Sequence, residues 1–231
     1  MTGTLYGIGV GPGDPELLTL KAARLIASCA VVAYPMANGE HSLARQIAAA
    51  HIQPDTLEKP YTLPMAADPA AAQAAYDCLA RSLQTDLSEG KDVAVLCEGD
   101  PLFYGSFAEV MRRIDDRTPV EVVPGIPSAH AAAAALKRPI VQRTASWSVL
   151  PATLPDTELA ARLRTADATA ILKLGRHFGR VRSLLESMGL AAQATYCERV
   201  GQAGERFVPL AEMNEPAAPY FSLILIHMQA K

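Results

Sequence analysis

The sequence has few cysteines and no clustered histidines, and both shortages exclude a class of site. Its 231 residues include four cysteines, which stand far apart and form no Cys-x-x-Cys pair. We therefore expect reduced thiols, as in a cytoplasmic protein, rather than a disulfide framework or a zinc site. The five histidines form no His-x-x-x-His pattern, and we expect no metal.

An excess of basic charge and a long apolar run are also missing. With 21 basic and 24 acidic residues the net charge is −3, which gives no reason to expect a nucleic-acid partner. The longest strongly apolar run, 221–226, is too short to span a bilayer, and no signal peptide is visible, so we expect no membrane partner. Half of the residues are apolar, which is enough for a substantial core.

Glycine, by contrast, is concentrated near the start of the chain. Residues 7–15 read Gly-Ile-Gly-Val-Gly-Pro-Gly-Asp-Pro. They follow a short β-like run at 4–6 and precede a stretch, 16–25, with apolar residues at helical spacing. A glycine-rich turn from strand to helix is typical of a ligand loop at the carboxyl edge of a parallel sheet.

The same stretch does not fit a phosphate site. In Gly-x-Gly-x-x-Gly the third glycine would be Pro12 or Asp14, and no Gly-Lys-Ser/Thr follows. Proline removes a backbone donor, and Asp14 adds negative charge where a pyrophosphate needs positive potential. No acidic residue closes a second strand about 20 residues later to hold a ribose. We therefore expect no NAD; the structural alternative is a tight strand-to-helix connection.

Strand-like and helix-like segments alternate, which predicts an α/β protein. A continuous apolar run at 93–97 is typical of a strand buried on both faces. We expect a domain at 1–123 with a mostly parallel sheet and a second α/β domain at 124–231 with a mixed sheet. No long helix separates the last strands, so we expect these to pair antiparallel. The expected strands are 4–6, 30–34, 56–61, 93–97, 120–123, 147–150, 169–174, 194–198, 205–208 and 220–227. The expected helices are 16–25, 42–50, 68–87, 107–114, 128–136, 156–164 and 177–188, and we expect Ser42 to be the N-cap of the second.

Four further loops follow predicted strands. In the loop at 98–107, Asp100 either caps a helix or faces a ligand, and the apolar and aromatic residues after it favour a pocket for a flat or adenine-like group. The loop at 122–129 has a rigid proline turn, and we expect Ser128 to cap the next helix. The remaining two loops are 173–176 and 197–201.

These loops together resemble the tetrapyrrole methyltransferases of corrin and sirohaem synthesis. The resemblance is carried by Gly-Val-Gly-Pro-Gly-Asp-Pro-Glu-Leu-Leu-Thr at 9–19, Glu-Gly-Asp-Pro at 98–101, Val-Pro-Gly-Ile at 123–126 and Glu-Arg at 198–199. It covers nearly the whole chain, in order. Tyr34-Pro35, Ser42-Leu43-Ala44 and the stretch 98–107 are most similar to the branch that methylates precorrin-2 at C-20.

The resemblance implies a homodimer that transfers a methyl group from S-adenosylmethionine to the C-20 meso carbon of precorrin-2, giving precorrin-3A in cobalamin biosynthesis. It implies that the donor is bound by Gly99, Asp100, Leu102, Phe103, Tyr104, Ser106, Phe107, Gly125, Ile126, Ser128, Ala129, Leu174, Gly175, Glu198 and Arg199. The residues expected to bind substrate are Gly11, Pro12, Gly13, Pro35, Ser42, Arg45, Lys173 and Arg176. The candidates for a catalytic role are Asp14, Glu98 and Tyr104.

Other readings stay open at this point. Within the family, the acceptor is alternatively cobalt-precorrin-2, or the methylated position is another one on the ring. Outside it, the alternatives are a nicotinamide oxidoreductase and a non-catalytic tetrapyrrole carrier. A tetrapyrrole with many carboxylates needs local cations, because guanidinium pairs bidentately with carboxylate. The cationic candidates are Lys21, Arg24, Arg45, Lys59, Arg143, Lys173, Arg176 and Arg199, with His130 and His177 as weaker ones.

Overall fold

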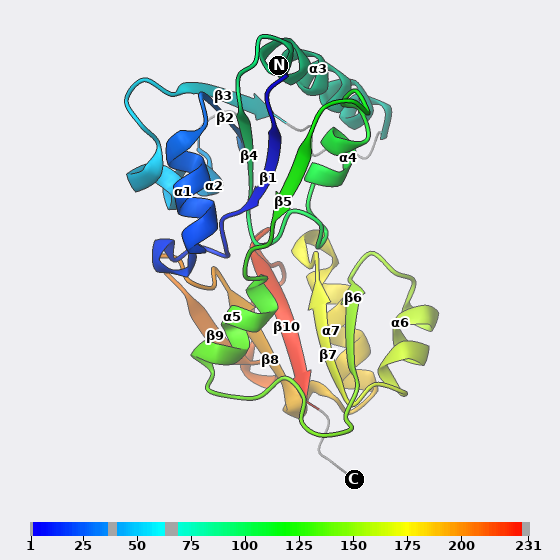
Figure 1. The fold of residues 1–231 in the computed structure, drawn as a ribbon. Coiled ribbons are helices and arrows are strands. Elements are labelled where there is room, and N and C mark those ends of the chain that lie inside the picture. Colours follow the sequence, from blue (N-terminus) through cyan, green and yellow to red (C-terminus); the bar gives the residue numbers. More distant parts are fainter. Residues whose placement is uncertain (1, 37–40, 63–68, 228–231) are drawn as a thin grey trace. The chain divides into compact units, whose positions relative to one another are not determined.

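The computed structural model describes residues 2–36, 41–62 and 69–227. The chain divides into two compact units, residues 1–127 (unit 1) and 128–231 (unit 2). Each unit has one five-stranded sheet with helices packed on it (Figure 1). The expected α/β fold is confirmed, while the domain boundary after residue 123 stays a prediction.

Unit 1 has a sheet in which all neighbouring strands are parallel, in the order β3-β2-β4-β1-β5. Parallel neighbours need crossover connections, and helices supply them. The strands are β1 (Leu5–Gly9), β2 (Val31–Met36), β3 (Leu57–Thr62), β4 (Val93–Cys97) and β5 (Val120–Val123). The helices are α1 (Leu20–Ser28), α2 (Leu43–Ala48), α3 (Pro69–Ser88) and α4 (Phe107–Met111), with 3-10 turns η1 (Pro15–Leu17) and η2 (Ala49–His51).

Alternate residues of the central strand β4 pack against different helix layers. Ala94 and Leu96 belong to the core formed with α1 and α2, whereas Val95 and Cys97 belong to the core formed with α3 and α4. Every residue of β4 is buried, as expected for the middle strand of a parallel sheet. The loop after β4 therefore leaves the middle of the sheet's carboxyl edge, between β1 and β2.

The glycine-rich stretch enters the sheet further than expected. β1 runs from Leu5 to Gly9, so Gly7 and Gly9 are strand residues and the expected short strand at 4–6 was wrong in its bounds. The ring of Phe107 lies on Gly7, where an added Cβ would be 2.4 Å from ring carbons. A glycine inside a strand commonly marks such a close approach.

The segment that follows is not one helix, contrary to the helical spacing at 16–25. The η1 turn ends at Leu17, and α1 begins only after Thr19. The Thr19 hydroxyl accepts the Ala22 N–H at 3.1 Å, which caps the new helix. The helical spacing of apolar residues continues from η1 into α1, but the Thr19 cap determines where α1 begins.

Unit 2 has a mixed sheet in the order β6-β7-β10-β8-β9. β6 and β7 are parallel, and the other three pairs are antiparallel, which confirms the expected pairing of the last segments. The strands are β6 (Trp147–Pro151), β7 (Ala168–Leu172), β8 (Ala194–Glu198), β9 (Arg206–Pro209) and β10 (Ser222–His227). The helices are α5 (Ser128–Ala135), α6 (Asp156–Leu163) and α7 (Phe178–Ser187), with 3-10 turns η3 (Gly175–His177), η4 (Ala191–Gln193) and η5 (Leu210–Glu212).

One face of this sheet packs against α6 and α7, and the other against α5 (Figure 1). Several element bounds differ from the expectation; for example, α4 ends at Met111, β7 ends at Leu172, and Ser128 is the first residue of α5 rather than its cap. Lys173 explains the end of β7, because its φ of 59° is incompatible with a strand.

Candidate functional site

The loops after β1 and β4 are joined by backbone hydrogen bonds just beyond the sheet. Gly11 and Gly99 form an isolated antiparallel bridge, with N–O distances of 3.2 and 2.8 Å. The Val10 N–H also donates to the Cys97 carbonyl at 2.9 Å. Gly11 and Gly99 have φ values of 80° and 68°, in the left-handed region that glycine enters without strain. The bridge therefore fixes both loops at the edge of the sheet.

A third loop crosses this pair at Gly125. An added Cβ on Gly125 would lie 2.0 Å from the Gly99 carbonyl oxygen and 2.8 Å from the Gly9 backbone. A Cβ on Gly9 would meet the Gly125 backbone at 2.5 Å. Three backbone segments thus pack at distances that exclude any side chain. We call Gly9, Gly99 and Gly125 the glycine crossing.

The carboxylate of Asp100 holds the loops after β4 and β5 together. Its Oδ1 accepts the N–H groups of Leu102 and Phe103 at 2.9 and 3.1 Å, and its Oδ2 accepts the Gly125 N–H at 3.1 Å. Asp100 is therefore not the cap of α4, since Ser106 stands at that position. It organises the loop, and contact with a ligand stays a proposal.

The stretch after Asp100 presents apolar side chains to solvent. Leu102 and Tyr104 are about half exposed, and Phe103 packs edge-to-face on Tyr104. Tyr104 has a φ of 57°, a strained value for a residue with a Cβ. Phe107, by contrast, is fully buried in the core below. Of this predicted group, Leu102 and Tyr104 are the residues most open to a ligand.

Glu98 follows directly after β4, and its carboxylate lies at the start of α2. The backbone N–H groups of Ala44 and of Glu98 itself face its carboxylate, but burial outweighs them and raises the pKa of Glu98 above its ordinary value. The Ser42 hydroxyl caps the same helix by accepting the Arg45 N–H at 3.2 Å, as the sequence predicted. The start of α2 and the end of β4 thus form one contact region.

The loop after β1 holds the other predicted residues of this edge. Asp14 accepts the Glu16 N–H at 2.9 Å and so caps η1. Gly11 and Pro12 are buried, while Gly13 is partly exposed. Pro35 is a residue of β2, opposite Tyr61 of β3.

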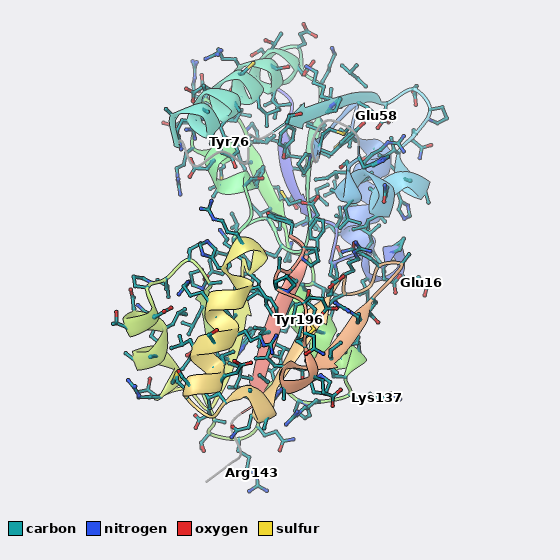
Figure 2. All side chains as sticks on the ribbon, turned by 180° about the vertical axis from the view of Figure 1, so that it is seen from behind. Glu16, Glu58, Tyr76, Lys137, Arg143 and Tyr196 are labelled. Carbon is teal, nitrogen blue, oxygen red and sulfur yellow. The ribbon has the colours of Figure 1, made fainter. Side chains whose placement is uncertain are left out.

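Arg45 is already engaged within unit 1. Its Nε and Nη2 donate to the two carboxylate oxygens of Glu58 at 2.8 and 2.9 Å, and Tyr34 lies beside the pair. Glu58 pairs with Val32 in the sheet, well below the carboxyl edge (Figure 2 labels Glu58 on β3). Two further candidates form ion pairs, Lys21 with Glu121 and Lys59 with Asp86. A substrate role for these three side chains stays a proposal.

Replacing Arg45 by methionine is expected to lower the free energy of unfolding by about 1 kcal/mol at pH 7, because this ion pair is partly exposed. Hydrogen bonding by Arg45 lowers the pKa of Glu58. The contribution is therefore present above the ordinary glutamate range and is lost as the pH falls through the lowered value. Urea denaturation from pH 7 down to about pH 3 measures it. A gap between wild type and variant that stays constant over this range would contradict the prediction.

In unit 2, the loop after β7 carries Lys173, Leu174, Gly175 and Arg176. Leu174 is buried, whereas Lys173 and Arg176 are exposed. A Cβ on Gly175 would meet nothing within 4 Å, so open space borders this backbone. Arg143 precedes β6, which is parallel to β7, and so lies at the opposite edge of the sheet from this loop (Figure 2). The structure therefore does not bring Arg143 together with Lys173 and Arg176.

The end of β8 has a network that the sequence did not reveal. Glu198 accepts the Tyr196 hydroxyl at 2.7 Å and Arg206 Nη2 at 3.1 Å (Figure 2 labels Tyr196). Arg206 also donates to Glu215 at 2.7 Å and lies over the Tyr196 ring. Burial, followed by the hydrogen bond to Glu198, raises the pKa of Tyr196. Arg206 lies on the antiparallel neighbour of β8, and only the strand register shows that it faces Glu198.

Three predicted donor-binding residues follow β5 and β8. Ile126 is partly exposed beside the glycine crossing, and Ala129 is buried in α5. Arg199 has a φ of 50°, and its N–H donates to the Phe221 carbonyl at 2.9 Å. Within the described residues, no three His, Cys, Asp or Glu side chains gather as metal ligands, and no helix is long and apolar enough to cross a membrane.

Comparison with known proteins places these loops in a family. Residues 4–214 match the model of the Tetrapyrrole (Corrin/Porphyrin) Methylases. A precorrin-2 C(20)-methyltransferase of Sinorhizobium is 38% identical, with 97% of this chain and 95% of the relative covered. A cobalt-precorrin-2 C(20)-methyltransferase of Salmonella typhimurium is 32% identical, with 99% and 98% covered.

Two further comparisons concern length and fold. The cobalamin biosynthesis protein CobIJ of Mycobacterium bovis is 43% identical over 97% of this chain, but the chain spans only 46% of that relative. The crystal structure of a cobalt precorrin-4 methyltransferase superposes with a TM-score of 0.75 at 22% identity, covering 97% of this chain and 94% of the other. The match over residues 4–214 and the two relatives aligned over almost their full length show that this chain belongs to the tetrapyrrole methylase family.

Proposed function

We propose that the chain is an S-adenosylmethionine-dependent C-methyltransferase that methylates precorrin-2 at C-20 to give precorrin-3A. The observation that carries this proposal is the 38% identity to the Sinorhizobium precorrin-2 C(20)-methyltransferase over nearly the full length of both chains. The nicotinamide alternative loses support, because the chain belongs to a methylase family and Pro12 and Asp14 interrupt the glycine fingerprint.

The loops fit a cationic methyl donor better than a nucleotide phosphate. Those of unit 1 offer backbone groups held close together by the glycine crossing and exposed apolar side chains at Leu102 and Tyr104. When bound, S-adenosylmethionine supplies an electrophilic methyl group on a sulfonium. Transfer to carbon depends mainly on alignment of the reacting atoms, which rigid loops favour.

The remaining site assignments belong to the same proposal. The donor-binding set comprises residues 99–107, 125–129, 174–175 and 198–199 named from the sequence, with Lys173, Arg176 and Arg199 as exposed cations for acceptor carboxylates. We also propose that the enzyme is a cytoplasmic homodimer and needs no metal. Gel filtration with light scattering, and activity after treatment with a chelator, test these two properties.

The test of function begins with calorimetric titration of the protein with S-adenosylmethionine, with NAD in parallel. Saturable binding of one donor per chain, and none of NAD, is expected. Incubation with precorrin-2 and donor carrying a ¹³C-methyl group should then add one methyl group, located at C-20 by NMR. Binding of NAD alone, or absence of methyl transfer to any tetrapyrrole, would overturn the proposal.

A second candidate substrate is cobalt-precorrin-2, which the 32% identity to the Salmonella enzyme favours. Metal-free and cobalt-loaded substrates offered separately and in competition decide between the two. Higher kcat/KM for the metal-free ring supports precorrin-2, and the reverse order supports the cobalt form.

A further inference from the structure

The side chain of Glu98 occupies a distinctive place at the carboxyl edge of unit 1. It follows β4, the middle strand of the sheet, and its neighbour Gly99 is bridged to Gly11. The Ala44 N–H at the start of α2 faces its carboxylate from the other side. Ligands of open α/β sheets bind outside the carboxyl ends of the strands. On the basis of the proposed function, we infer that Glu98 is the catalytic residue that accepts the C-20 proton after methyl transfer.

The other two carboxylates of this edge, Asp14 and Asp100, already accept hydrogen bonds from backbone N–H groups. The two carboxylate oxygens of Asp100 accept hydrogen bonds from three N–H groups. If Asp100 took a proton from substrate instead, the loop would lose its hydrogen bond to Gly125. Asp14 caps η1 through the Glu16 N–H. Tyr104 offers a hydroxyl rather than a carboxylate. Glu98 combines a carboxylate with a place at the middle strand, and no lysine or arginine of the described residues forms an ion pair with it.

The groups around Glu98 allow its carboxylate to accept a proton. The ionisable groups whose pKa the Glu98 charge affects are the thiol of Cys97, the last residue of β4, and the Tyr61 phenol of β3; burial is the main cause that raises the pKa of both. Both therefore stay neutral at pH 7. From α2 only the Ala44 N–H contributes, because Arg45 is bound to Glu58. Burial raises the pKa of Glu98 as well, which increases its proton affinity as a general base demands.

In the proposed step, an electron pair of the ring forms the new bond from C-20 to the methyl carbon, while the carbon–sulfur bond breaks and its pair stays on sulfur as a neutral thioether. C-20 then carries both a methyl group and a hydrogen. The Glu98 carboxylate takes that hydrogen as a proton, and the pair of the carbon–hydrogen bond returns to the ring and restores its conjugation. The proton leaves Glu98 to solvent before the next turnover.

Glu98→Gln tests the inference, with Glu89→Gln as the matched control. The amide introduced by Glu98→Gln keeps an oxygen that accepts the Ala44 N–H, whereas Glu89 lies beyond α3 and pairs with Lys91 at 2.7 Å. We expect Glu98→Gln to lower kcat by about 100-fold or more and to leave the affinity for S-adenosylmethionine within about threefold of wild type. Glu89→Gln should keep wild-type kcat.

Two further measurements distinguish a catalytic role of Glu98 from a purely structural one. With substrate deuterated at C-20, the isotope effect on kcat should be larger in Glu98→Gln and Glu98→Asp than in wild type, because proton loss becomes rate-limiting. The wild-type rise of kcat with pH through the Glu98 ionisation should be absent in Glu98→Gln. If Glu98→Gln fails to fold, Glu98→Asp carries the isotope test. An unchanged isotope effect in Glu98→Asp, or kcat of Glu98→Gln within threefold of Glu89→Gln, overturns the inference; failure of the wild type to methylate precorrin-2 overturns the proposed function instead.

Discussion

Gly125→Ala is expected to destabilise unit 1 more than any other single methyl addition in the glycine crossing. The new Cβ would lie 2.0 Å from the Gly99 carbonyl oxygen and 2.8 Å from Gly9, and all of these neighbours are backbone atoms that cannot rotate away. Relief requires separation of the loops, which also lengthens the hydrogen bond from Gly125 to Asp100. Overpacking of this kind costs about 3 kcal/mol, or roughly 10 °C in Tm. Urea and thermal denaturation measure it.

Gly179→Ala is the matched control for this change. Gly179 lies inside α7, and its added Cβ would be 3.3 Å from the Pro216 carbonyl oxygen. Alanine gains up to about 1 kcal/mol of helix propensity over glycine, which offsets the mild contact. We expect a change of less than about 1 kcal/mol. Equal losses for Gly125→Ala and Gly179→Ala would show that the glycine crossing is looser than its distances indicate.

Asp100→Ala is expected to cost about 2–3 kcal/mol of unfolding free energy and to weaken binding of the methyl donor at least tenfold, or about 1.4 kcal/mol. Three backbone N–H groups lose a charged acceptor, and the loop that carries Leu102 and Tyr104 loses its tie to Gly125. Some of these N–H groups reach water, so the loss is smaller than three full hydrogen bonds. Denaturation and calorimetry on one preparation measure both effects.

Asp100→Asn separates the hydrogen bonds to Leu102 and Phe103 from the hydrogen bond to Gly125. One amide oxygen can still accept from Leu102 and Phe103, but the NH₂ group repels the Gly125 N–H. Its effect should therefore fall between wild type and Asp100→Ala. Asp115→Ala, in an exposed turn, is the control and should leave donor affinity unchanged. Unchanged donor affinity in Asp100→Ala would remove Asp100 from any part in donor binding.

Much of the architecture was predictable because local signals agreed with the fold. The apolar run of β4 predicted a strand buried on both faces, and all of it is buried. Ser42 was predicted as a helix cap from its residue type and position, and its hydroxyl accepts the Arg45 N–H. Element bounds were less certain where one residue decides them, as Thr19 and Lys173 do.

The contacts within the candidate site were predictable only in part. The sequence indicated that the loops carrying Gly99 and Gly125 each follow a predicted strand, but not that their backbones touch at the glycine crossing. Nor did it reveal that Arg206 faces Glu198, because that contact depends on the register of two antiparallel strands. Charge alone suggested Arg45 as a substrate ligand, whereas Glu58, 13 residues away in sequence, already binds it.

The strand order of unit 1 also determines when the candidate site can form as the chain is synthesised. β1 is made first, but both of its partners, β4 and β5, are made late; Thr4 donates to Asp92, 88 residues further on. A ribosome-bound chain therefore carries β1 with neither partner until β4 has left the exit tunnel, and with only one partner until β5 has emerged. Such long-range parallel pairing folds slowly, and exposed strands of this kind are prone to aggregate. Chaperone capture of nascent chains should therefore end only once synthesis has passed well beyond residue 125.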